Sequence, residues 1–341
     1  MHLNRKNTTI LSVVAGLGIL GTILAIVGPK KVINQIATLG WDGFGFLIVS
    51  ILGMFLFWTL AWLVIMRGFE VEAPIPLCFW ARIGSFAVSY LTPSMHFGGE
   101  PVRALVIERE SESSYSRIFA TIVAERISMM TALVTVIVLG ALFGLFSQLP
   151  TNTLLYLVLI SLLFVFLLTS LILNFYKNLF LFTRFLAWLK KLLPWPEILG
   201  KVEGIVKHLE QEINMAFGQH IKHTFIALLL DLIATIFMLL RPQIYFYFTQ
   251  GRIFSLIELT MLFALISVLS SMFWITPGGI GIAEGGLIGI FALFGISGSE
   301  AVAYSFSVKV IEFFFVGVGL ALLARYGIMN LLFERRGKSE N

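Results

Sequence analysis

The chain has 341 residues, of which 58% are hydrophobic and 13% charged, and its formal net charge is +5. This composition excludes a soluble globular domain and is typical of a protein that crosses a membrane several times. A single cysteine, Cys78, excludes a disulfide framework and a thiolate metal cluster. The basic residues are not interleaved with aromatic residues on a polar surface, so they do not indicate nucleic-acid binding and instead report orientation in the membrane.

Apolar runs in the first half predict full spans. Arg5 and Lys6 precede the run Ile10 to Val27, which is long enough to cross and has no small-residue cleavage site before Gly28, so we interpret it as an uncleaved first span. The further spans predicted in this half are Phe44 to Met66, Arg117 to Phe146 and Leu154 to Leu173.

A broken segment lies between the second and third spans. It consists of Leu77 to Tyr90, a break at Thr92 and Pro93, and a short helix, Glu100 to Arg109. Proline removes a backbone donor and glycine weakens a helix, while lipid cannot hydrogen-bond the freed groups. We therefore predict a re-entrant hairpin whose break is buried in protein or lines a watery cavity.

The connection Asn174 to Lys222 is long and polar, and its apolar residues recur at helical spacing. These residues are Ile198, Val202, Ile205, Val206, Leu209 and Ile213. Before them, Phe180 to Leu193 mixes large apolar residues with Arg184, Lys190 and Lys191, whose long stems can reach lipid headgroups. We interpret residues 174–222 as a cytoplasmic, interfacial amphipathic linker; a helix that docks a partner is the alternative.

The second half repeats this order. Phe225 to Phe248 predicts a span, Phe254 to Ile275 enters, a break follows, and Ile282 to Gly295 is too short to cross. Tyr304 to Leu323 is the last span. The sequence thus predicts an all-α polytopic membrane protein with two re-entrant hairpins and about six full spans.

The two breaks match at a fixed spacing. The matched residues, each 184 positions apart, are Thr92 and Thr276, Pro93 and Pro277, and Glu100 and Glu284. The flanking apolar runs shift by the same amount, which predicts repeats over residues 44–146 and 228–330 within one transmembrane domain, residues 1–341. Two halves that each contain a broken helix are typical of transporters whose site lies near the bilayer midplane.

Lysine and arginine predict the orientation. With the N-terminus inside, the inner segments hold 17 of these residues and the outer loops hold 3, namely Lys30, Lys31 and Arg252. Both termini are therefore predicted to be cytoplasmic, in the plasma (inner) membrane, with the two halves inverted. Counting either hairpin as two full crossings leaves the parity unchanged, so that alternative stays open.

Charged residues inside the predicted segments are costly in lipid and should face the interior. They are Arg82, Glu125, Arg126, Asp231, Arg241, Glu258, Lys309 and Glu312. For Glu125, Arg126, Lys309 and Glu312, ion pairs between helices and contacts to a substrate are equally acceptable interpretations. For Asp231, Arg241 and Glu258, nearer the span ends, we favour structural ion pairs.

The breaks are the candidate site. Amide groups near Gly98 to Gly99 and Gly279 to Gly281 can hold an anion such as a lipid phosphate, and Glu100 and Glu284 can either complement the helix dipole or receive a cationic headgroup. His96 is either a proton-coupling residue or a hydrogen-bonded neighbour. The candidate substrate-binding residues are Thr92, Pro93, Gly98, Gly99, Glu100, Arg103, Glu125, Arg126, Thr276, Pro277, Gly278, Gly279, Gly281, Glu284, Lys309 and Glu312.

Several catalytic motifs are missing from the sequence. It contains no Walker A loop, no H-E-x-x-H, no G-x-S-x-G and no acidic run that would hold magnesium. We therefore predict no catalytic residue, no metal site and no cofactor.

Three motifs carry a resemblance to a known family: G-G-E-P-V-R-A at Gly98 to Ala104, the pair Glu125 and Arg126, and T-P-G-G-I-G-I-A-E at Thr276 to Glu284. With these motifs the sequence resembles the transmembrane, flippase-like domain family of lysylphosphatidylglycerol synthases. The resemblance extends from about Phe44 to the last span. The resemblance implies movement of aminoacylated phosphatidylglycerol between leaflets. Only eleven residues follow Asn330, so we expect this chain to lack the soluble domain that charges the lipid in full-length synthases. The resemblance therefore implies translocation rather than lysyltransferase activity.

We therefore expect a lipid translocase for a phospholipid, such as aminoacylated phosphatidylglycerol, or for a polyprenyl-linked lipid. One alternative is a secondary transporter of a small solute coupled to H⁺ or Na⁺. The other is a membrane subunit of a lysyl- or glycosyltransferase, with a soluble partner on residues 174–222. The expected partner is an anionic or aminoacylated membrane lipid, and oligomers are compatible with the sequence.

Overall fold

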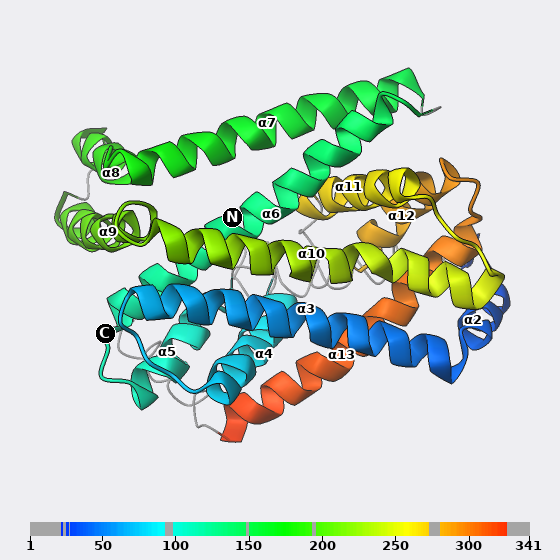
Figure 1. Cartoon of the computed structure of the whole chain (residues 1–341), viewed down its shortest axis with the longest axis horizontal. Coiled ribbons are helices and arrows are strands. Elements are labelled where there is room, and N and C mark those ends of the chain that lie inside the picture. Colours follow the sequence, from blue (N-terminus) through cyan, green and yellow to red (C-terminus); the bar gives the residue numbers. More distant parts are fainter. Residues whose placement is uncertain are drawn as a thin grey trace, which may run out of the picture.

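The computed structural model describes residues 22, 25–26, 28–92, 98–147, 150–192, 196–272 and 280–325. Within these ranges every regular element is a helix, which confirms the all-α class (Figure 1). The helices are α2 (Pro29–Thr38), α3 (Gly40–Gly68), α4 (Ile75–Leu91), α5 (Glu100–Glu110), α6 (Tyr115–Gly144), α7 (Thr151–Tyr176), α8 (Leu181–Leu192), α9 (Pro196–Phe217), α10 (Ile221–Gln250), α11 (Leu256–Met272), α12 (Ile282–Ala292) and α13 (Gly298–Arg325).

Five helices in the described part of the chain are long and apolar enough to cross a membrane: α3, α6, α7, α10 and α13. They confirm five predicted spans and a multi-pass membrane protein, while the predicted span Ile10 to Val27 lies almost entirely outside the described residues. Helix α7 is apolar all round, and large side chains such as Leu162 and Phe166 are exposed on it. A helix of this kind is stable only where its surroundings are apolar.

Helices α3 and α10 lie side by side and run in opposite directions (Figure 1). The Phe46 ring lies beside that of Phe248, with ring centroids 5.4 Å apart, and Phe57 stacks on Phe237 at 5.7 Å. The Ser50 hydroxyl donates a 2.6 Å hydrogen bond to the Phe237 carbonyl oxygen. Since α4 follows α3 and α11 follows α10, the two broken segments begin at opposite ends of this antiparallel pair.

In the first broken segment α5 packs back against α4. The Gly99 amide donates to Ser89 Oγ at 2.9 Å, and a Cβ on Gly99 would lie 1.9 Å from the Ser85 carbonyl oxygen. Only glycine allows this close return. In the second segment a Cβ on Gly286 of α12 would lie 2.4 Å from the Leu269 side chain of α11.

Each broken segment also packs against the long helix that ends the other half, α4 on α13 and α11 on α6. A Cβ on Gly319 would lie 2.6 Å from the Ile83 carbonyl oxygen, and one on Gly140 would lie 2.9 Å from the Thr260 carbonyl oxygen. Small residues let membrane helices approach this closely. The reciprocal packing is compatible with the predicted repeats, whose inverted symmetry and re-entrant insertion stay predictions.

Candidate functional site

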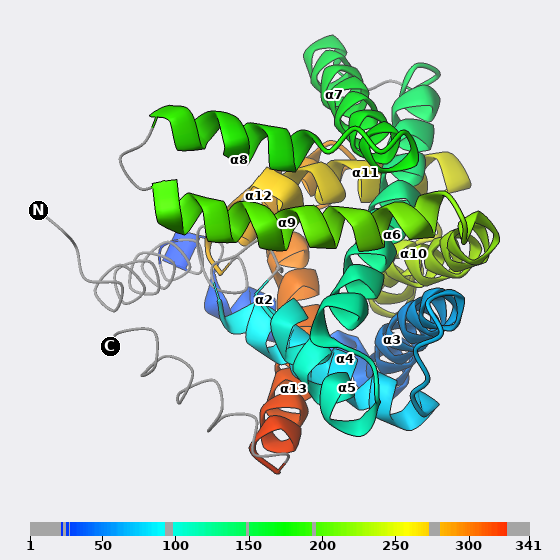
Figure 2. The ribbon, with the colours of Figure 1, turned by 90° about the vertical axis from the view of Figure 1, so that its left-hand side faces the viewer.

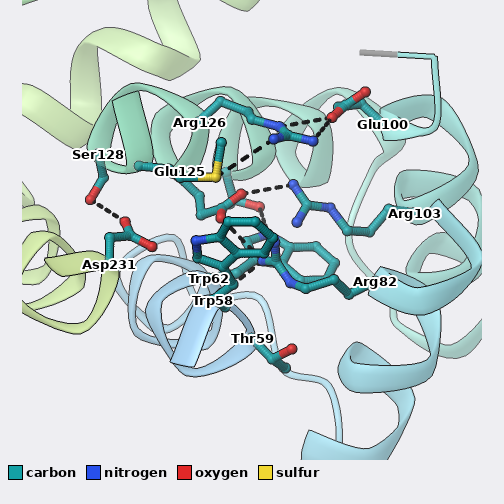
Figure 3. Close-up of polar contacts among 12 residues, drawn as sticks. Trp58, Thr59, Trp62, Arg82, Glu100, Arg103, Glu125, Arg126, Ser128 and Asp231 are labelled. Atoms are coloured by element: carbon teal, nitrogen blue, oxygen red, sulfur yellow. Dashed lines mark hydrogen bonds and ion pairs between the residues drawn. The ribbon is translucent and has the colours of Figure 1, made fainter. Parts of the chain in front are cut away.

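The site is built around Glu125 of α6, whose side chain is fully buried. Arg103 of α5 donates through Nη2 to Glu125 Oε2 at 2.9 Å, and Arg82 Nη2 of α4 lies 3.2 Å from Oε1 (Figure 3). A carboxylate isolated from water is costly unless cations and hydrogen bonds compensate it. Two guanidinium groups, one from each helix of the first broken segment, provide this compensation.

Helix α3 lies below the two arginines in Figure 3 and contacts both of them. Arg82 Nη2 donates to the Trp58 carbonyl oxygen at 2.7 Å, and the guanidinium of Arg103 stacks over the Trp62 ring at 4.3 Å. The Trp62 indole in turn donates to Thr121 Oγ1 of α6 at 3.0 Å. Stacking and charge pairing together use the planar guanidinium in a way that lysine cannot reproduce.

A second ion pair links the start of α5 to α6. Arg126 Nε donates to Glu100 Oε1 at 2.8 Å, and Arg126 Nη2 contacts the same oxygen. Adjacent residues on a helix point about 100° apart, so Glu125 and Arg126 serve different partners. Glu100 lies in the first turn of α5, where a carboxylate complements the helix dipole. Its other oxygen, Oε2, is buried and has no hydrogen-bond partner within the residues that the structure describes.

The second half contains the matching pair. Glu284, in the first turn of α12, accepts from Lys309 Nζ of α13 at 2.5 Å and from Ser305 Oγ at 2.9 Å. Its other oxygen accepts from the Gly281 amide at 2.7 Å. Glu284 is therefore a helix cap and an ion-pair partner at the same time.

Helix α10 contributes two further charged residues, Arg241 and Asp231, which contact other long helices. Arg241 Nη1 lies 3.6 Å from Glu312 Oε1 of α13, and its Nη2 contacts Met54 Sδ of α3 at 2.9 Å. Asp231 is fully buried and accepts from Ser128 Oγ of α6 at 2.6 Å. Among the described residues it forms no ion pair, and its second oxygen has no hydrogen-bond partner.

These contacts settle the charge pairing that the sequence left open. Glu125 pairs with Arg82 and Arg103 rather than with Lys309, while Lys309 and Glu312 reach other helices instead of each other. The ion pair between helices expected for Arg241 is confirmed by its contact with Glu312 of α13. For Glu258 the expectation was wrong, because its partner Arg252, 4.0 Å away, lies in the loop that precedes the same helix. The expectation was wrong for Asp231, because a serine hydroxyl takes the place of the cation.

The amide groups predicted to hold an anion are partly engaged. The Gly99 amide donates to Ser89 and the Gly281 amide to Glu284, so neither points freely to a ligand. Thr92 lies at the end of α4, where its hydroxyl donates to the Val88 carbonyl oxygen at 2.9 Å. Gly98 lies in the turn before α5. The other predicted break residues lie outside the described residues: Pro93, His96, Thr276, Pro277, Gly278 and Gly279.

The candidate residues omitted three buried charged residues whose partners the structure shows: Arg82, Asp231 and Arg241. All three were visible as charges inside predicted spans, and that signal alone would have been enough to include them. Over the ranges that the structure describes, no group of three His, Cys, Asp or Glu side chains could hold a metal ion.

The chain matches the family model described as the lysylphosphatidylglycerol synthase TM region over residues 9–319. A UPF0104 membrane protein of Methanothermobacter thermautotrophicus is 23% identical over 94% of this chain and 96% of its own length. The UPF0104 membrane protein MJ1595 of Methanocaldococcus jannaschii is 25% identical over 99% of this chain and 100% of its own length. No solved structure matches.

Proposed function

Because the chain belongs to the lysylphosphatidylglycerol synthase transmembrane-region family, we propose that it is a lipid translocase. Its substrate would be a phospholipid, such as aminoacylated phosphatidylglycerol, or a polyprenyl-linked lipid. One observation carries the proposal: each broken segment starts its short helix with a buried glutamate paired to a cation on the next long helix. The two pairs are Glu100 with Arg126 and Glu284 with Lys309.

The pairs suit an amphiphile whose headgroup carries both charges. A phosphate can replace the glutamate as the partner of Arg126 or Lys309, while an ammonium group can bind the released carboxylate. Glu100 Oε2, buried and without a hydrogen-bond partner in the described residues, is an acceptor for such a group. Opening a buried pair with no replacement leaves an uncompensated charge at a cost of about 3–5 kcal/mol. A headgroup that supplies both replacements avoids this cost, so the pairs would open for it selectively.

The arrangement also suits alternating access. The antiparallel contact of α3 with α10 supports inverted repeats, in which the hairpins enter from opposite sides and meet near the midplane. In this account both termini are cytoplasmic and the protein lies in the plasma membrane. The headgroup would pass from one ion pair to the other while its acyl chains stay in lipid.

Leaflet exchange of a labelled phospholipid in liposomes tests the proposal. The double variants Glu100→Gln/Arg126→Met and Glu284→Gln/Lys309→Met remove each pair without leaving a lone charge. Each is expected to fold and to lose most of the exchange, whereas Glu258→Gln, on the exposed pair with Arg252, should keep it. Wild-type exchange in both folded double variants would contradict the proposal. Uptake of a small solute driven by an ion gradient, with no lipid exchange, would favour the secondary transporter.

A further inference from the structure

Helices α8 and α9 lie across the ends of the long helices. They are seen nearly end-on in Figure 1, where α7 and α10 extend across the view, and lengthwise in Figure 2, where α7 and α10 point toward the viewer. Helix α8 therefore runs across α7 and α10 rather than along them, at the same end of the molecule as α5 (Figure 1). A helix in this position can lie along a membrane surface.

Helix α8 presents an apolar face that the described helices leave largely uncovered, although Phe182 at its start stacks on Phe175 of α7 with ring centroids 6.2 Å apart. Five large side chains at helical spacing are 46–61% exposed: Leu181, Phe182, Phe185, Trp188 and Leu192. The rings of Phe185 and Trp188 stack with centroids 5.8 Å apart. The opposite side of α8 packs on α9, where Lys190 lies 3.5 Å from Glu203. The face is thus aromatic and turned away from the protein.

The charge at the edge of this face has one sign. Arg184 and Lys191 are exposed beside it, and the sequence of α8 contains no Asp or Glu. Basic residues that flank an aromatic face are complementary to anionic headgroups above acyl chains. The stems of Arg and Lys can follow the apolar surface while their charges stay at the phosphates.

A buried carboxylate fixes the start of α8. Glu210 of α9 is 3% exposed and accepts from the Phe182 amide at 3.2 Å, the Thr183 amide at 3.0 Å and the Thr183 hydroxyl at 2.5 Å. Asn174, at the end of α7, donates to the same carboxylate at 3.3 Å. These bonds hold α8 to both neighbouring helices. The helix and its apolar face are therefore already formed before they contact a membrane.

We propose that α8 is a membrane-surface anchor for an anionic phospholipid leaflet. Phe185 and Trp188 lie among the upper acyl segments, and Arg184 and Lys191 bind the phosphates. The Trp188 ring suits this depth because it is apolar and carries a polar N–H at its edge, and the Phe185 ring adds apolar area. The anchor concentrates anionic lipid at the end of the molecule where the first hairpin begins. The proposed anchor does not depend on the ion pairs of Glu100 and Glu284, and it holds whether or not lipid crosses the protein.

Spin labels on the full-length protein in phosphatidylglycerol nanodiscs test the anchor. The lone cysteine, Cys78, is first replaced by Ala, and labels are placed through Phe185→Cys or Leu192→Cys on the apolar face and Lys207→Cys on exposed α9. Labels at 185 and 192 should collide with oxygen, which is enriched in lipid, and the label at 207 with a water-soluble nickel chelate. Nickel access at 185 and 192 equal to that at 207 would overturn the proposal.

The charge requirement is tested in the same discs. Phosphatidylcholine alone, or the double variant Arg184→Gln/Lys191→Gln in phosphatidylglycerol, should raise nickel access at residue 185 several-fold. Equal access in all discs would overturn the assignment to an anionic surface. Exclusion of both reagents at 185 and 192 would show a protein covering the face and would also overturn it. None of these outcomes depends on leaflet exchange, so failure here is distinct from failure of the translocase proposal.

Discussion

Glu284 at the start of α12 accepts a hydrogen bond from Lys309 of α13 at 2.5 Å, within a helix pair that has a counterpart in the first half of the chain. There Glu100 at the start of α5 pairs with Arg126 of α6. The acids are 184 positions apart, but the cations are not, because the residue 184 positions after Arg126 is Val310. Lys309 instead matches Glu125, so the second half moves its cation by one position and lacks the buried acid at that place.

Breaking the second pair should destabilise the protein. Lys309→Met keeps the length of the side chain but leaves the carboxylate of Glu284 buried without its cation. We expect a loss of about 3–5 kcal/mol, and Glu284→Gln added to this variant should restore part of it. Thermal unfolding in detergent measures both variants, and a single variant that unfolds at the wild-type temperature would contradict the account.

Glu125→Gln should have a similarly large effect in the first cluster. It leaves Arg82 and Arg103, both buried, without their shared anion. The expected loss is about 3–5 kcal/mol. The control is Glu258→Gln, whose pair with Arg252 is exposed and should contribute about 0–1 kcal/mol. Equal unfolding temperatures for these two variants would show that the cluster does not stabilise the first hairpin.

Because α5 packs so closely against α4, we expect alanine substitutions at two glycines to change the stability in opposite directions. Gly99→Ala places a methyl group 1.9 Å from the Ser85 carbonyl oxygen, which the backbone must move to relieve, and we expect a loss of about 1–3 kcal/mol. Gly289→Ala in α12 meets nothing within 4 Å, so it should stabilise by about 0.5–1 kcal/mol. Unfolding temperatures that shift in the same direction would contradict this packing.

Because Ser128 donates a hydrogen bond to Asp231, we expect substitutions of the two residues to lower the stability by different amounts. Ser128→Ala removes the donor to a fully buried carboxylate and should cost about 1–3 kcal/mol. Asp231→Asn keeps a group that can hydrogen-bond to the serine hydroxyl and should cost less. A double-mutant cycle between the two positions measures the coupling, and zero coupling would contradict the contact.

The sequence predicted the long helices and the two broken segments because apolar length and the Thr92–Pro93 break are local signals. It did not predict α2, since Pro29–Thr38 is polar on one face and lies in what reads as a loop. The sequence also could not predict which charged side chains would contact one another. Arg82 joins the site through an ion pair that reaches from α4 to α6, and Asp231 through packing of α10 on α6. Spacing along one helix carries no information on such contacts.

Native mass spectrometry of the purified protein with its bound lipid tests most directly whether the ion pairs form a headgroup site. The comparison is between wild type and the double variants Glu100→Gln/Arg126→Met and Glu284→Gln/Lys309→Met, all in a mild detergent. The account predicts that wild type retains a defined anionic or aminoacylated lipid, and that each variant loses it while remaining folded. The same amount of bulk lipid on all three proteins would contradict a site at these pairs.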